Sequence, residues 1–228
     1  MNTENQQKRR VLVTGARGFI GWPCLEMLRE RGYEIHCVSS KEIEPDSVED
    51  TWHQVNLLEP YAVQQLMQKV RPQILLHCAW ITTPGEFWRS SENRKWVDAS
   101  IHLLEQFARF DGERAVITGA CAEYDWTLGE CTEEETPRDS KTLFGQSKNE
   151  LWRKIIANEN IRRVSIAWAR IFFPYGPGEQ EDKFIAASIC NMLKGKAARC
   201  DSANTRRDYM HIYDVAQALV QVLDSDFN

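Results

Sequence analysis

The chain has 228 residues, of which 43% are hydrophobic and 27% are charged, and its formal net charge is −5. A chain of this size can bury a sizeable core in one domain. The negative charge argues against a nucleic-acid-binding protein, which normally carries a basic face. No apolar run approaches the roughly 20 residues that a membrane helix needs, and the polar start lacks the apolar stretch of a secretory signal.

The seven cysteines are odd in number, and no two of them form a Cys-x-x-Cys pair. Most lie inside apolar stretches, as small buried thiols do. We therefore expect reduced thiols in a cytoplasmic protein, with neither a disulfide framework nor a metal site.

Short apolar runs alternate with amphipathic stretches along the whole chain. The runs predict strands at Val11–Thr14, Ile35–Ser39, Ile74–Cys78, Ala115–Thr118 and Val164–Ala169. The apolar spacing between them predicts helices at Cys24–Arg31, Tyr61–Val70, Trp96–Phe110, Ser147–Ala157 and Lys183–Leu193. This alternation predicts an α/β protein with a doubly wound, mostly parallel sheet of the Rossmann type.

A glycine turn follows the first of these strands. Gly15 permits a tight turn, Gly18 lets the backbone approach a pyrophosphate, and Gly21 lets the next helix pack closely. The helix N-terminus adds free N–H groups and a positive dipole end. The expected cofactor contacts in this turn are Gly15, Ala16, Arg17, Gly18, Phe19 and Ile20. A glycine turn without a ligand is the alternative.

The end of the second strand bears on the choice between NAD and NADP. An acidic residue there would bind the adenosine ribose and favour NAD. This chain has Ser39, Ser40 and Lys41 instead, and Arg17 adds a second cation. Hydroxyls and cations tolerate a 2′-phosphate, so the sequence favours NADP. In the alternative interpretation Lys41 is a surface lysine.

Two motifs carry a resemblance to a known family. The first is Thr-Gly-x-x-Gly-Phe-Ile-Gly at residues 14–21, and the second is Phe-Gly-Gln-Ser-Lys at 144–148. Together they resemble the extended short-chain dehydrogenase/reductases, the NAD-dependent epimerase/dehydratases of nucleotide sugars. The resemblance runs from Val11 to about Leu223. It implies a nucleotide-sugar substrate and hydride transfer at sugar C4.

The same resemblance assigns the catalytic positions. The family uses a Tyr-x-x-x-Lys pair, and here Phe144 stands at the tyrosine position while Lys148 is present. Ala120 stands where the family has a Ser or Thr. Thr118 lies two residues earlier and is a candidate substitute, and Cys121 is a candidate acid/base or a packed thiol. Phe144 lacks the phenol oxygen and Ala120 lacks the hydroxyl oxygen that the family uses, which places the catalytic competence of the chain in question.

Further cofactor contacts are implied by the resemblance. By the resemblance, Asn56 and Leu57 stand after the family's third strand and correspond to residues near the adenine. Cys78 and Ala79 end the strand that passes under the nicotinamide ribose. His77, in the same strand, lines that site or is a buried, hydrogen-bonded core histidine.

The substrate side is expected in the last third of the chain. Tyr175 lies in a segment that resembles the family's loop towards the substrate domain, and one of Arg206 and Arg207 is expected to bind the diphosphate. The expected division is a Rossmann domain at 1–170, a partial substrate lobe at 171–204 and a returning loop and helix at 205–228. Family members continue for several dozen residues more, so we expect a fragment or a naturally short relative.

The leading interpretation is an NAD(P)-dependent nucleotide-sugar epimerase or 4-ketoreductase homologue. A catalytically silent NAD(P)- or sugar-nucleotide-binding module, or a variant that traps substrate, remains open. The family often dimerises through two long helices, so a homodimer is expected, with Phe107 and Trp152 as candidate interface residues.

Overall fold

The computed structural model describes residues 8–42, 50–81, 83, 85–198, 200, 204 and 206–225. The ends of the expected domain ranges, at residues 1–7, 205 and 226–228, lie outside the described residues. All seven cysteines lie within the described ranges, and each carries a free thiol. No helix in these ranges is long and apolar enough to cross a membrane.

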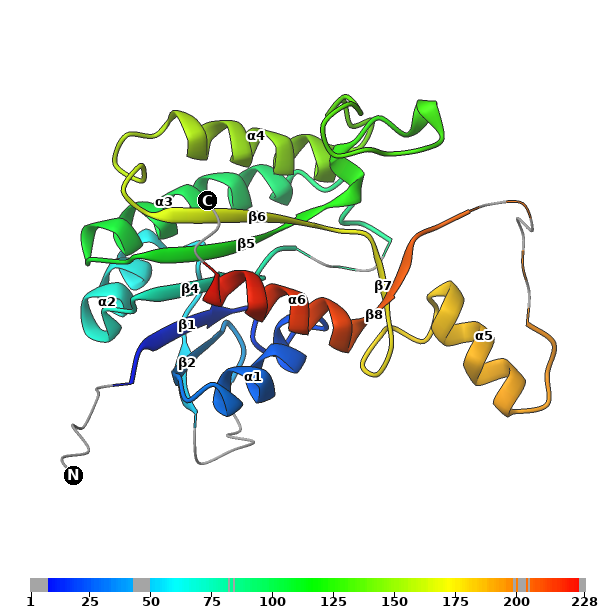
Figure 1. Ribbon diagram of the computed structural model, residues 1–228, viewed down its shortest axis with the longest axis horizontal. Helices are drawn as coiled ribbons and strands as arrows, with labels where there is room; N and C mark the ends of the chain where they lie inside the picture. Colours follow the sequence, from blue (N-terminus) through cyan, green and yellow to red (C-terminus); the bar gives the residue numbers. More distant parts are fainter. Residues whose placement is uncertain are drawn as a thin grey trace.

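A six-stranded parallel sheet forms the centre of the molecule (Figure 1). Its strands are β1 (Arg10–Thr14), β2 (Glu34–Ser39), β3 (Thr51–Gln54), β4 (Ile74–His77), β5 (Arg114–Ala120) and β6 (Ser165–Ile171). Their order in the sheet is β3-β2-β1-β4-β5-β6. The direction of winding reverses between β1 and β4, and ligands of such sheets bind where the carboxyl ends of the strands flank this point.

Helices cover both faces of the sheet. The helices α1 (Gly21–Glu30) and α6 (Ile212–Asp224) pack side by side on one face, and the other face carries α2 (Pro60–Val70), α3 (Glu92–Arg109) and α4 (Leu143–Ala157). Each face has its own hydrophobic core. A sheet buried on both faces requires apolar residues at consecutive strand positions, and all residues of β4 are buried. The predicted α/β Rossmann architecture is therefore confirmed.

An arm extends from the carboxyl end of β6. It contains β7 (Phe173–Tyr175), which pairs in parallel with β8 (Tyr209–His211), and α5 (Phe184–Leu193) between them. Figure 1 shows α5 standing away from the sheet. The chain then returns through β8 into α6, where the His211 side chain accepts a hydrogen bond from the Tyr213 N–H and caps the helix.

The candidate interface residues need one correction. Phe107 is fully buried, and its ring packs so closely over Gly112 that a Cβ on that glycine would lie 2.5 Å from ring carbons. This ring belongs to the core and is not available to a second copy. Helical spacing predicts which residues share a face of the helix, but it does not predict which part of the molecule covers that face. Trp152 is half-buried and packs against Trp168, with ring centroids 5.5 Å apart.

Candidate functional site

The glycine turn lies between β1 and α1, at the carboxyl edge of the sheet. Gly15 adopts φ +66°, and a Cβ there would lie 2.8 Å from the Ala79 nitrogen. A side chain at Gly21 would collide with the Gly15 carbonyl oxygen. The turn is held by a 2.8 Å hydrogen bond from the Gly18 N–H to that same carbonyl. Close packing thus requires glycine at both ends of the turn.

The N-terminus of α1 fits an anion. Ile20 stands at the N-cap position and makes no side-chain capping hydrogen bond, and no acidic residue lies in the first turn. The first N–H groups of a helix lack intrahelical acceptors, and the positive dipole end favours a phosphate. These residues therefore fit the pyrophosphate of a dinucleotide.

Residues expected to contact the adenosine half gather around the ends of β2 and β3. The Lys41 N–H donates to the Ser39 hydroxyl over 3.1 Å, and Lys41 is exposed. The Arg17 guanidinium lies 5.1 Å from the centre of the Trp52 ring. Asn56 accepts a hydrogen bond from the Leu58 N–H, so its side-chain oxygen is engaged in a local turn.

His77 has the second of its two expected roles. Its Nδ1 lies 2.7 Å from the Thr14 hydroxyl and its Nε2 lies 2.9 Å from the Ser100 hydroxyl. Burial lowers the pKa of His77 to about 3, so the ring is neutral. The Thr118 hydroxyl donates to the His77 carbonyl oxygen over 3.2 Å, which engages it inside the sheet. His77 is a hydrogen-bonded core histidine that joins β1, β4 and α3.

Phe144 and Lys148 lie one turn apart at the start of α4. The Thr142 side chain caps this helix by accepting a hydrogen bond from Gly145. A Cβ at Gly145 would collide with the Ala122 carbonyl oxygen. Glycine therefore lets the start of the helix approach the turn that follows β5.

The ring of Phe144 stands among three other aromatic rings. It makes edge contacts with Phe87, Trp88 and Trp80 at centroid distances of 5.2, 5.7 and 6.5 Å. The loop that carries Trp88 also accepts a 3.2 Å hydrogen bond from the Phe144 N–H. Residue 144 consequently has an apolar, aromatic environment.

The ammonium of Lys148 is buried, with 3% of the residue exposed. Its Nζ donates to the Thr118 carbonyl oxygen over 2.8 Å and lies 3.7 Å from the centre of a Trp80 ring. Burial lowers the pKa of Lys148 to about 7. Lys148 and the glycine turn contact adjacent residues, because Gly15 abuts Ala79 and Lys148 contacts Trp80.

A buried ion pair lies beside these residues, and the sequence analysis missed it. Glu123 is fully buried in the 3₁₀ turn η1 (Cys121–Glu123). Its carboxylate accepts hydrogen bonds from the Ala120 N–H at 2.8 Å, from Trp168 Nε1 at 3.0 Å and from Arg170 Nε at 2.7 Å. The sequence carries a signal for Arg170, which is a lone charge within an otherwise apolar run.

The expected substrate residues lie on the arm and beside η2 (Trp126–Leu128). Arg207 lies between two rings, 5.7 Å from the centre of Trp126 and 5.3 Å from that of Phe173. Its Nη1 donates to the Arg206 carbonyl oxygen over 2.8 Å, and both arginines are exposed. Among the residues that the structure describes, Arg207 is thus the candidate arginine that contacts the rings of other elements.

Two further candidates occupy this side of the site. Tyr175 makes an edge contact with the His211 ring at 5.4 Å. The carbonyl of Cys121 accepts from Trp126 Nε1 over 2.9 Å, and burial raises the pKa of its thiol to about 11. A thiol with this pKa is protonated at neutral pH.

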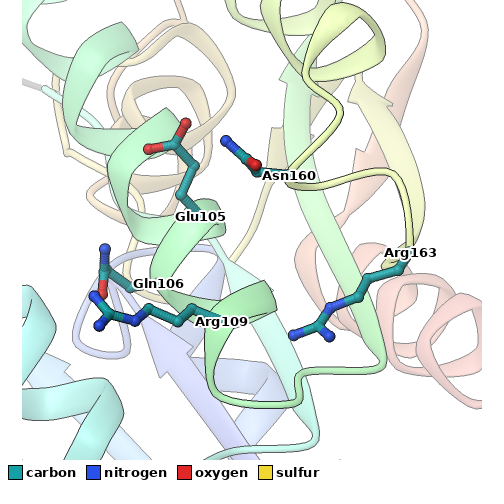
Figure 2. A pocket seen from close by; sticks show the side chains of 5 residues that line it. All are labelled: Glu105, Gln106, Arg109, Asn160 and Arg163. Atoms are coloured by element: carbon teal, nitrogen blue, oxygen red, sulfur yellow. The ribbon is translucent and has the colours of Figure 1, made fainter.

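The hollow shown in Figure 2 lies at the opposite edge of the sheet from the glycine turn. Its volume is about 370 Å³, and it lies between the C-terminal end of α3 and the turn before β6. Its walls are the polar side chains of Glu105, Gln106, Arg109, Asn160 and Arg163. These residues are at the amino edge of β5 and β6, opposite the glycine turn. The candidate functional site is at the carboxyl edge, where the motifs converge.

Fold and site together define a dinucleotide-binding protein of the Rossmann type. The chain belongs to the NAD dependent epimerase/dehydratase family, whose model matches residues 11–228. The expected family is thereby confirmed.

Individual relatives are distant. Methionine adenosyltransferase 2 subunit beta of Bos taurus is 25% identical over 224 residues, which cover 96% of this chain and 64% of the relative. UDP-glucose 4-epimerase of Neisseria meningitidis serogroup C is 24% identical over 257 residues, covering 96% of this chain and 74% of the relative. The chain thus spans less than two thirds of the length of the first of these proteins.

Solved structures share the fold. The UDP-glucose 4-epimerase of Thermotoga maritima with UDP-glucose superposes with a TM-score of 0.80 at 20% identity, covering 94% of this chain and 73% of that one. An NAD-dependent NDP-hexosamine 5,6-dehydratase involved in tunicamycin biosynthesis gives a TM-score of 0.79 at 22% identity, with 97% and 74% covered.

Proposed function

We propose that this chain is an NAD(P)-dependent nucleotide-sugar epimerase or 4-ketoreductase homologue that transfers a hydride at sugar C4. One observation carries the proposal. The glycine turn abuts Ala79 while Lys148 lies against Trp80, so the two family motifs meet on adjacent residues at the end of β4. That position is where open parallel sheets bind their ligands.

The residues present fit a dinucleotide along this edge. The turn at residues 15–20 and the uncapped start of α1 hold the pyrophosphate. Asn56 and Leu57 flank the adenine, and Cys78, Ala79 and Lys148 flank the nicotinamide ribose. The bound nicotinamide supplies a hydride acceptor and donor. Tyr175 and Arg207 face the sugar nucleotide, and Arg207 contributes a guanidinium fork for its diphosphate.

NADP is the preferred cofactor in this proposal. Arg17, which is held over Trp52, supplies positive charge at the edge where β2 ends, and Lys41 supplies more. Ser39 and Ser40 stand where an acidic residue would select the ribose of NAD. The protein acts in the cytoplasm as a homodimer, by analogy with its family.

The second candidate is a catalytically silent binding module or a substrate-trapping variant. Phe144 and Ala120 carry no side-chain oxygen, and the Thr118 hydroxyl already bonds the His77 carbonyl. One relative is named as a subunit of a methionine adenosyltransferase, so the family is not limited to proteins named as epimerases.

Cofactor titration tests the proposal directly. NADPH and NADH fluorescence should report saturable binding, with NADPH bound more tightly. Gly15→Ala should abolish binding, because a Cβ would meet the Ala79 backbone. Gly32→Ala is the matched control, since Gly32 also has a positive φ of +77° but has nothing within 4 Å. Absence of binding up to millimolar cofactor refutes the proposal, and preference for NADH refutes the NADP assignment.

A further inference from the structure

The helix α5 (Phe184–Leu193) is apolar, and its own chain does not cover it. The helix contains no charged residue, and none of its residues is buried. The side chains of Phe184, Ile189, Met192 and Leu193 are exposed, and 83% of Leu193 is accessible to solvent. Figure 1 shows α5 standing away from the sheet, and no other described helix or strand packs extensively against it. A contiguous apolar surface of this kind marks an interaction site.

The exposed apolar residues gather on one face of α5. Met192 and Leu193 come three and four positions after Ile189, and Ile185 comes four positions before it. Residues with these spacings share a face of a helix. A helix as short as α5 is marginal in water by itself, and most helical stability in proteins comes from the packing of such a face. We therefore expect another element to cover this face.

The two ends of α5 carry charges of opposite sign. Glu181 and Asp182 are exposed shortly before the helix, and Lys194 and Lys196 are exposed directly after it. Glu181 and Lys196 lie at equal distances along the chain from the middle of α5. In the described part of the chain neither of these two side chains forms a salt bridge. An identical helix laid antiparallel to α5 would place each acidic end beside a basic end.

We propose that the exposed face of α5 pairs with the same face of a second copy of this chain, with the two helices antiparallel. The two-fold axis passes near Ile189, so the apolar residues of the two helices cover one another. Each Glu181 then lies opposite the partner's Lys196. Such a contact is isologous and closes on itself, as in most homodimers. This inference rests on the homodimer of the proposed function and assigns the surface through which it forms.

The outer surface of α3 and α4 suits a second copy less well. Lys154 of α4 pairs with Asp98 of α3 over 3.0 Å, and Lys95 pairs with Glu92 over 2.7 Å. Ile156 is the one exposed large apolar side chain on these two helices, all of whose residues the structure describes. Burial of charged pairs carries a desolvation penalty, whereas burial of apolar surface is favourable. The apolar surface therefore favours α5 over the two long helices as the dimer contact.

The start of α5 lies close to the candidate site but away from the glycine turn. Lys183 stands at the N-cap of α5, and its Nζ lies 5.9 Å from the centre of the Phe87 ring. That ring contacts Phe144 at a centroid distance of 5.2 Å. The glycine turn is held by other elements, β1 and α1. Separation of the two copies should therefore leave dinucleotide binding intact.

Sedimentation of the full chain over a micromolar concentration series tests the inference. Ile189→Asp places a charge at the centre of the proposed contact, and Ile156→Asp, on α4, is the matched control. Glu181→Lys, Lys196→Glu and the combination of both test the antiparallel arrangement. Circular dichroism and an NADPH titration of each variant check its fold and its cofactor site.

We expect a dimer that dissociates on dilution, because a helix of this length is only about 15 Å long and the interface is small. Ile189→Asp should weaken association about 30-fold or more, since it would bury a carboxylate without a partner. Ile156→Asp should leave association unchanged. Each single charge reversal should weaken association about fivefold, because a surface ion pair contributes little but this one occurs twice in the dimer. The combined reversal should restore it.

Four results would overturn the inference. A chain that stays monomeric at the highest concentration would show that α5 serves a different partner. A dimer that withstands Ile189→Asp, or one that Ile156→Asp disrupts instead, would place the contact elsewhere, in the latter case on α3 and α4. A combined reversal that associates no better than the single ones would exclude the antiparallel pairing. Absence of dinucleotide binding by the unmodified chain would instead refute the proposed cofactor site and leave the sedimentation result standing.

Discussion

The buried ion pair between Glu123 and Arg170 should be a principal support of the site. Their side chains are 0% and 10% exposed, and the carboxylate also accepts the Ala120 N–H and the Trp168 indole N–H. Removing one member leaves the other charged and buried, which costs about 3–5 kcal/mol. We therefore expect Arg170→Met and Glu123→Gln each to lower the free energy of unfolding by about that amount.

The double variant isolates the charge from the hydrogen bonds. Glutamine at 123 keeps one oxygen for the Ala120 and Trp168 N–H groups, while methionine at 170 removes the unpaired cation. The double variant should therefore lose less than about 2 kcal/mol, so that the two changes are strongly non-additive. Urea unfolding of the four proteins measures the cycle. Single variants that lose less than about 1 kcal/mol, or losses that simply add, would refute this reasoning.

Three further predictions concern chemistry and pH. Phe144→Tyr with Ala120→Ser should raise NADPH oxidation by 4-keto sugar nucleotides about 10²-fold in stopped-flow assays; no gain despite bound substrate would favour the silent module. The free energy of unfolding should rise from pH 7 towards pH 9, with a slope of up to about 1.4 kcal/mol per pH unit. The reason is that Lys148 in the unfolded chain keeps a proton which the folded chain releases near pH 7. Urea midpoints of Lys148→Met should lack this slope, and an equal slope would contradict the assignment. Burial lowers the pKa of His36 and brings that of His53 to about 4, so the free energy of unfolding should fall as the pH drops from 6.5 towards 4. The variant His53→Phe should lose less stability over this pH range in the same assay. An unchanged loss would exclude His53 as its source.

Local sequence patterns predicted five of the six strands of the central sheet, because those strands are mostly apolar runs, whereas β3 reads Thr-Trp-His-Gln and was not predicted. The expected run at Ala115–Thr118 became β5 at Arg114–Ala120, whose residues are nearly all buried. The strands β7 and β8 have only three residues each and gave no such pattern. Short strands of that kind form because the returning chain brings them together, which no local window can report.

The residues of the candidate site likewise fall into those that local motifs reveal and those that only the fold brings together. The glycine turn and Lys148 lie in compact motifs with fixed spacing, so sequence alone could identify them. Glu123 and Arg170 are 47 positions apart and meet only because β5 and β6 are neighbours in the sheet. The engagement of the Thr118 hydroxyl by the His77 carbonyl is equally non-local. Motifs therefore predicted the edge of the sheet at which the cofactor is proposed to bind, whereas the buried ion pair and hydrogen bonds of that edge could be seen only in the fold.

The residue at position 144 bears on the pKa of Lys148. In the arrangement that the family resemblance implies, a phenol beside the ammonium can ionise, and each charge then stabilises the other. Here the rings of Phe144, Trp80 and Phe87 stand together in that region and provide no anion. Burial lowers the pKa of Lys148 to about 7, against the nearby charge of Glu123, which acts to raise it. We therefore expect Phe144→Tyr to raise the pKa of Lys148, one helical turn away.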